Sequence, residues 1–191
     1  ICGLLGGHDV DAGTTLTYGL TGNNVVISPF SSNNVTYNLA QDGAYGTVHL
    51  NSTTGAYLYV PDPVKVNALA QGATPSENFS FTTSDGIAPA VTQTYTINVT
   101  GANDAPTLDT IPAGSVADAV NSAALGATNS LSGLLGGHDV DAGTTLTYGL
   151  TGNNVVNSEF SSNNVTYNLA QDGAYGTVHL NSTTGAYLYV P

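Results

Sequence analysis

The residues best suited to chemistry are aspartates in a short motif that the chain contains twice. The motif is DVDAG, and its carboxylates are Asp9 and Asp11 in the first copy and Asp139 and Asp141 in the second. In an extended backbone alternate side chains point to the same side, so the two carboxylates of each motif would lie together. The glycine that ends the motif lets the chain turn around an ion. Calcium takes about six to eight oxygen ligands of this kind, and the motif therefore predicts a Ca²⁺ site.

Further oxygen ligands lie in the segment GANDAP, which we expect to be a linker because it is short and polar and ends in a proline. Asn103 and Asp104 supply an amide carbonyl and a carboxylate there, and Asp104 lies 35 residues before Asp139. If this segment lies beside the second DVDAG loop, all these groups can share one ion. The predicted ligands are then Asn103, Asp104, Asp139 and Asp141, with Asp118 and Asp85 as candidates to complete the site, and with Asp9 and Asp11 as the counterparts in the first copy.

These carboxylates would repel one another if they were unpaired, because the net charge is −12 and Lys65 is the only Lys or Arg. A bound cation removes this repulsion. The alternative is that DVDAG and SDG are only turns, since Asp and Gly are frequent turn residues. Asp42 and Asp62 we expect to be ordinary turn residues.

The chain is organised around an internal repeat with a period of 130 residues. Residues 1–61 and 131–191 differ at four positions, so 57 of 61 match. A unit of this length suits a self-contained domain better than a solenoid repeat. We expect residues 1–101 to be a β-sandwich repeat without its N-terminal segment, 102–106 a linker, and 107–191 a second repeat without its C-terminal strands. The differences are Ile1/Leu131, Cys2/Ser132, Ile27/Asn157 and Pro29/Glu159.

Composition and alternation predict an all-β chain. Only 7% of residues are charged, and Gly, Thr, Asn, Ser, Val and Tyr are abundant. About seven strands separated by turn signals are typical of tandem immunoglobulin-like or cadherin-like sandwiches. Alternation points Phe79 and Phe81 inward, while residues 66–72 read as a loop or a single helical turn. The clearest strands are expected at residues 15–20, 35–40, 46–51, 55–60, 77–83 and 93–100, and residues 107–130 should hold an edge strand and a long loop.

Several classes of function are disfavoured. The acidic charge argues against nucleic acid and anionic membranes as partners, and no apolar run approaches the ~18 residues of a membrane span. Because the chain has no GxSxG elbow, HExxH motif or phosphate loop, we expect no enzyme activity. Cys2 is a single cysteine, which excludes a disulfide framework within one chain. His8, His49 and their second copies we expect to be solvated imidazoles rather than zinc ligands.

Five motifs in order, GGHDVDAGTTLTY, YGTVHLNSTTGAYLYVP, VNALAQG, NFSFTTSDG and QTYTINVTGANDAP, resemble the VCBS-type repeat of large bacterial surface adhesins. That family is related in architecture to cadherin and to other immunoglobulin-like calcium modules. The resemblance implies β-sandwiches repeated in a secreted, cell-surface or biofilm-associated protein and stiffened by calcium. Such repeats often carry a Glu early in the first strand region, and here the nearest candidate is Asp118.

The expected function is therefore a structural repeat of an extracellular adhesin, acting as a calcium-rigidified spacer or fibre building block. Two alternatives stay open. One is a subunit that exchanges strands with copies of itself in a filament, since residues 1–61 and 131–191 could each pair with the strands of residues 62–101; the given sequence could equally be a window on a longer chain. The other is a module that binds surface glycans through its Tyr-rich strands, which burial of the aromatic side chains would disfavour. These side chains are Tyr18, Tyr37, Tyr57, Tyr59 and Tyr95.

Overall fold

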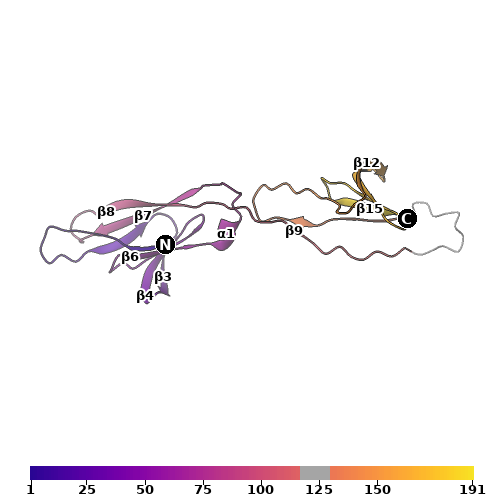
Figure 1. The fold of residues 1–191 in the computed structure, drawn as a ribbon. Coiled ribbons are helices and arrows are strands. Elements are labelled where there is room, and N and C mark those ends of the chain that lie inside the picture. The colour runs from indigo at the N-terminus through magenta and orange to yellow at the C-terminus, as the bar shows by residue number, and fades with distance from the viewer. Residues whose placement is uncertain (117–129) are drawn as a thin grey trace. The chain divides into compact units, whose positions relative to one another are not determined.

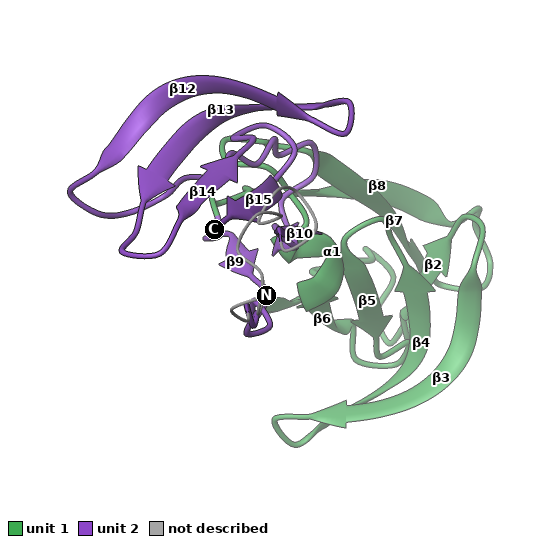
Figure 2. Cartoon of the chain, turned by 90° about the vertical axis from the view of Figure 1, so that its right-hand side faces the viewer, with its two compact units in different colours: residues 1–103 green, residues 104–191 purple. Residues whose placement is uncertain are grey.

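The chain is all-β, as the sequence predicts, with one short helix among the residues that the structure describes. The structure is a computed structural model that describes residues 1–116 and 130–191. It forms two compact units, residues 1–103 and 104–191, coloured separately in Figure 2. The boundary lies inside the predicted linker 102–106. Within the described ranges, no helix combines the length and hydrophobicity needed to cross a membrane.

Unit 1 contains two antiparallel sheets, and all of their strands except β1 are labelled in Figures 1 and 2. A five-stranded sheet has the order β1-β6-β5-β4-β3, and a three-stranded sheet has the order β2-β7-β8. Each neighbouring pair is antiparallel. The strands are β1 (Cys2–Leu4), β2 (Thr17–Thr21), β3 (Val25–Ser32), β4 (Val35–Asp42), β5 (Gly46–Leu50), β6 (Ala56–Pro61), β7 (Ser76–Ser84) and β8 (Val91–Asn98).

The core of unit 1 lies between these two sheets. Val48 and Leu50, two residues apart on β5, are fully buried, and Phe79 and Phe81 on β7 face them from the other sheet. Burying such a side chain stabilises a fold by about 1.5–3 kcal/mol. The alternation seen in the sequence therefore identified the inward face of both strands, and unit 1 is a β-sandwich.

Strand β3 (VVISPFSS) and its counterpart β12 (VVNSEFSS) were not predicted, because a bulge in each strand breaks the alternation of inward and outward residues. The ladder between β3 and β4 shifts register between Ile27 and Phe30, and this bulge accommodates Pro29, which has no N–H to donate. Asn33 and Asn34 then close the hairpin with φ values of 51° and 62°, as a two-residue hairpin turn with both φ values positive requires. Figure 2 shows β3 and β4 as a long, curved hairpin, and β12 and β13 as its counterpart in unit 2.

The helix α1 (Pro63–Asn67) begins three residues before the predicted helical turn. Asp62 is its N-cap, and its Oδ1 accepts from the backbone N–H groups of Val64 at 3.0 Å and Lys65 at 3.4 Å. Pro63 follows the cap, where its missing N–H costs nothing. Asp62, expected to be an ordinary turn residue, therefore starts the crossing between the two sheets.

Unit 2 repeats the five-stranded sheet in the order β10-β15-β14-β13-β12. A separate two-stranded ladder joins β9, which is the predicted edge strand, to β11. Residues 147–151, which correspond to β2, form no strand, and no described residues of unit 2 correspond to β7, with which β2 pairs in unit 1. The strands are β9 (Thr107–Leu108), β10 (Leu131–Leu134), β11 (Gly137–His138), β12 (Val155–Ser162), β13 (Val165–Asp172), β14 (Thr177–Leu180) and β15 (Ala186–Val190).

Candidate metal centre

The second DVDAG loop lies beside the segment that enters unit 2. Strand β9 pairs antiparallel with β11, so that Leu108 is opposite Gly137 and Thr107 is opposite His138. The backbone N–H of Asp109 extends the ladder by donating to the carbonyl of Gly136 at 2.8 Å. Because the two segments run in opposite directions, residues just before β9 meet residues just after β11, which are those of the loop.

Asp141 is the centre of this contact. Its Oδ2 accepts from the backbone N–H of Asp104 at 2.9 Å, and its own backbone N–H donates to Oδ1 of Asp139 at 2.8 Å. The side chain of Asp141 is only 6% exposed, and its Oδ1 is buried without a hydrogen-bond partner. A buried carboxylate oxygen in this state carries an uncompensated desolvation cost.

The first copy of the motif has the same loop but a different environment. Oδ1 of Asp9 accepts from the backbone N–H of Asp11 at 2.7 Å, as in the second copy, yet both carboxylates are exposed to solvent. In the part of unit 1 that the structure describes, no strand pairs with Gly7 and His8, the counterparts of β11. The segment around β9 is therefore what buries Asp141.

The structure brings together only part of the predicted ligand set. Asp104, Asp139 and Asp141 are joined by the hydrogen bonds above, but Asp104 contributes its backbone N–H to that contact. Asn103 is exposed at the end of unit 1, and Asp118 lies outside the described residues. Within residues 1–116 and 130–191, no three His, Cys, Asp or Glu side chains gather into a group that could hold a metal. Any cation here would also need backbone carbonyls and water as ligands.

Asp85, a candidate metal ligand from the sequence, has its carboxylate bound to its own turn. Oδ1 of Asp85 accepts from the backbone N–H groups of Ile87 and Ala88, both at 2.9 Å, and these bonds lower the pKa of its carboxyl group. Asp85 thus closes its own turn at the end of β7.

The backbone of the DVDAG motif is not extended, and that expectation was wrong. The chain bends from Val140 onward, directly after Asp139.

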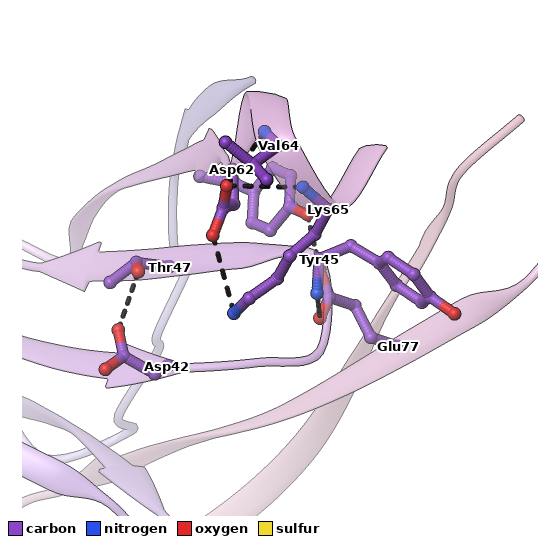
Figure 3. A network of polar contacts seen from close by, with 8 residues as sticks. Asp42, Tyr45, Thr47, Asp62, Val64, Lys65 and Glu77 are labelled. Carbon is purple, nitrogen blue, oxygen red and sulfur yellow. Dashed lines mark hydrogen bonds and ion pairs between the residues drawn. The ribbon is translucent and has the colours of Figure 1, made fainter. Parts of the chain in front are cut away.

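Several other charged side chains form ion pairs or hydrogen bonds within their own unit. Lys65 Nζ lies 3.5 Å from Oδ2 of Asp62, a solvent-accessible pair visible in Figure 3, whose attraction is screened by water and salt. In unit 2, His138 Nε2 lies 3.1 Å from Oδ2 of Asp109, and both side chains are 65% exposed. Asp42 accepts from the hydroxyl of Thr47 at 2.6 Å, which ties together the ends of β4 and β5.

The prediction of solvated imidazoles was wrong for one of the two histidine positions. His179 is 9% exposed, and its ring stacks on Phe160 with centroids 4.1 Å apart; His49 stacks on Phe30 at 4.2 Å. Nδ1 of both rings is buried without a partner, and burial lowers the pKa of both imidazoles. The stacking partners lie on β3 and β12, the strands that alternation did not reveal.

A buried carboxylate that the sequence reading missed joins the two sheets of unit 1. Glu77 on β7 is 7% exposed, and one of its oxygens accepts from the hydroxyl of Tyr59. The other oxygen accepts from the backbone N–H of Tyr45 at 3.0 Å, a contact drawn in Figure 3. Desolvation, followed by the bond to Glu77, raises the pKa of the Tyr59 phenol. The sequence did indicate that Glu77 points inward, because Glu77 alternates in phase with the inward residues Phe79 and Phe81.

No protein-family model matches the sequence, and no curated protein is significantly similar to it. The resemblance to VCBS-type repeats therefore stays a prediction that depends on the five motifs. What the geometry itself supplies is a buried, unpaired carboxylate oxygen where the chain enters unit 2.

Proposed function

We propose that this chain is part of a structural repeat array of a secreted or cell-surface adhesin, in which Ca²⁺ stiffens the start of a β-sandwich unit. The observation that carries the proposal is Asp141, which is 6% exposed and has an Oδ1 without a hydrogen-bond partner. Such a group needs a positive charge or a donor, and a cation satisfies it.

Charge balance favours a metal ion over a protein cation. Lys65 is the only Lys or Arg in 191 residues, and it contacts Asp62. The oxygens at this contact are the carboxylate oxygens of Asp139 and Asp141, and carboxylates are hard-oxygen ligands that suit Ca²⁺ better than softer metals. Calcium would tie the entering segment to the loop and so restrict the freedom of the chain at that point.

The burial of the aromatic side chains supports a spacer rather than a glycan-binding module. Tyr37 and Tyr59 are each 3% exposed, and Tyr18, Tyr57 and Tyr95 are partly buried against the core of unit 1. Strands that use their aromatic rings as core cannot offer the same rings to a sugar. For an extracellular module the expected calcium affinity is weak, with a dissociation constant of about 0.1–1 mM.

The test is thermal and denaturant unfolding of the 191-residue chain in EDTA and in 10 mM CaCl₂. With a dissociation constant of about 0.1–1 mM, calcium should stabilise unit 2 by about 1.4–2.7 kcal/mol. Asp141→Asn should abolish this gain. The matched variant Asp11→Asn makes the same change in the exposed copy of the motif and should retain it.

Equal loss of the calcium effect in both variants, or no calcium effect in the unaltered chain, would contradict the proposal. In that case DVDAG is only a turn. Magnesium at the same concentration serves as the control for ionic strength, because it demands a smaller octahedral shell and sheds water reluctantly.

A further inference from the structure

The outer half of the long β3–β4 hairpin (Figure 2) extends beyond the strand that pairs with its base. The ladder between β4 and β5 ends at the pair Leu39–Leu50, whereas β3 and β4 stay paired with each other up to Ser32 and Val35. We call residues 30–37, which lie beyond that point, the flap of unit 1. Because an isolated two-stranded hairpin is only marginally stable in water, the flap needs contacts with the rest of the unit.

An aromatic stack connects the flap to β5. The ring of Phe30 on β3 lies on the ring of His49 on β5, with centroids 4.2 Å apart and planes 17° from parallel. Tyr37, which is opposite Phe30 in the ladder, has its ring 6.2 Å from that of His49 and is only 3% exposed. Strand β4 separates β3 from β5 in the sheet, so the stack joins two strands that share no ladder.

Unit 2 has the same arrangement, with residues 160–167 as its flap. The ladder between β13 and β14 ends at the pair Leu169–Leu180, and Phe160 stacks on His179 with centroids 4.1 Å apart and planes 17° from parallel. The residue that precedes the stacked phenylalanine differs between the two copies, yet the geometry is the same. The stack is therefore a property of the hairpin and of the histidine on the neighbouring strand.

Each imidazole has a ring nitrogen that the closed flap leaves unpaired. Nδ1 of His49 and Nδ1 of His179 are both buried without a hydrogen-bond partner. A neutral imidazole has a proton on one nitrogen only, so Nδ1 can be the nitrogen without a proton, whereas a charged imidazole has a donor at both. A buried charged donor without an acceptor carries a large desolvation cost. A second proton therefore requires that water or an acceptor reach Nδ1, which the stacked flap prevents.

Few charged groups surround either imidazole. Strand β3 has no charged residue, and β6 and β15, which flank β5 and β14, have only tyrosines as titratable groups, whose phenols stay protonated in acid. One aspartate near each imidazole favours its charged form, but burial has the larger effect and lowers the pKa of both rings. The titratable groups of the two hairpins are Asp42 and Tyr37 in unit 1, and Asp172, Tyr167 and the exposed Glu159 in unit 2.

We propose that each flap is an acid-sensitive latch, which the Phe–His stack holds closed while the imidazole is neutral and which protonation of the imidazole opens before the unit unfolds. Opening uncovers the buried ring of Tyr37 or Tyr167 and gives each unit an aromatic surface in acid only. Asn51 Nδ2 donates to the carbonyl of Thr36 at 2.6 Å, and this bond does not titrate, so it keeps the open flap tethered to the unit. The latch does not involve the DVDAG aspartates and is independent of the proposed calcium site.

Proton NMR of the full chain in EDTA, from pH 8 to pH 4.5, tests the latch. At high pH the ring current of the stacked phenyl group should shift the imidazole protons of His49 and His179 away from those of the exposed His8. This difference should disappear as the two rings titrate. Backbone amide exchange, corrected for its intrinsic pH dependence, should rise about tenfold in residues 30–37 and 160–167, while the amides of β5 and β14 stay protected.

Two outcomes in the unaltered chain would overturn the proposal. Exchange that rises together in the flaps, β5 and β14 would mean that acid unfolds the whole unit rather than opening a latch. Exchange in the flaps that stays constant while the imidazoles titrate would mean that the closed stack accommodates the charged ring. Neither measurement depends on the folding of a variant.

Two substitutions in unit 1 separate titration of the imidazole from packing of the stack, and the unaltered flap of unit 2 is the control within the same molecule. His49→Gln has no proton to gain in this pH range, so the flap of unit 1 should lose its pH dependence while that of unit 2 keeps it. Phe30→Leu removes the stack but leaves the imidazole, so exchange in the unit 1 flap at pH 8 should approach its acid value. A pH dependence that persists in His49→Gln would assign the effect to Asp42 and overturn the proposal.

Discussion

The hydroxyl of Tyr59 on β6 donates to the carboxylate of Glu77 on β7, and this bond connects the two sheets of unit 1 through their buried interior. The second oxygen of Glu77 accepts from the backbone N–H of Tyr45. Both oxygens of a nearly buried carboxylate are thus satisfied without any cation. The sandwich is held by a polar contact as well as by its apolar core.

Glu77→Gln should destabilise unit 1 by about 1–3 kcal/mol, because an amide replaces a charged acceptor and turns one donor toward existing donors. The measurement is the free energy of urea unfolding. Glu159→Gln removes the same charge from an exposed position on β12 and should change stability by less than about 0.5 kcal/mol. Equal effects from the two substitutions would show that net charge, not the buried contact, is responsible.

The stability of both units should fall as the pH drops below about 6.5. His49 and His179 have pKa values below the ordinary 6.5 in the folded chain, mainly because burial disfavours the charged ring. The unfolded chain therefore binds more protons at low pH. Stability is fully present above the unfolded pKa and is lost as the pH falls toward the folded pKa.

Unfolding in urea between pH 7.5 and 5 measures this dependence. His49→Leu together with His179→Leu should flatten it, whereas His8→Leu, at an exposed position, should leave it in place. A profile that is unchanged in the double variant would assign the pH dependence to the carboxylates.

Gly55→Ala should cost more than Gly72→Ala, although both glycines have nearly the same positive φ, +75° and +78°. A side chain in this left-handed region costs about 1–2 kcal/mol at either position. At Gly55 the added Cβ would also lie 3.1 Å from the ring of Tyr18, whereas at Gly72 nothing lies within 4 Å. The difference between the two unfolding free energies isolates the crowding, and equal losses would mean that the Tyr18 ring simply moves aside.

Leu50→Ala and Leu180→Ala make the same change in the two copies of one strand. Leu50 is enclosed by both sheets, so its loss should cost about 2–5 kcal/mol. Leu180 is also fully buried, but it lines a cavity of about 520 Å³, so the packing around it is less complete and its substitution should cost less. Hydrogen exchange of β5 and β14 reports each unit separately, and a larger effect at Leu180 would mean that the cavity does not weaken the packing there.

Alternation revealed the strands whose faces are sharply different. In β5 and β7 the inward residues, such as Leu50 and Phe81, repeat every second position and were identified from sequence. It failed for β3, where Pro29 and the bulge break the period, and for β1, whose pairing of Cys2 with Leu58 depends on a partner far along the chain. Long-range pairing of three residues leaves no local pattern.

The candidate metal site could be predicted only in part from the sequence, for a different reason. DVDAG is the same five residues in both copies, yet Asp11 is exposed and Asp141 is buried. The difference comes from the segment around β9, and from a backbone N–H of Asp104 that has no side-chain signature. A sequence can mark candidate oxygens, but burial depends on what packs over them.

The bulge in β3 recurs in β12, between Asn157 and Phe160, and two of the four differences between the copies fall within it. Ile27 is 84% exposed and apolar where the second copy has Asn157, and Pro29 stands where the second copy has Glu159. A bulged stretch is partly released from the ladder, so its residues can change while the hairpin keeps its register. The two hairpins therefore keep one backbone geometry while their side chains differ at the bulge, apolar and without an N–H at position 29 in unit 1, polar and acidic in unit 2.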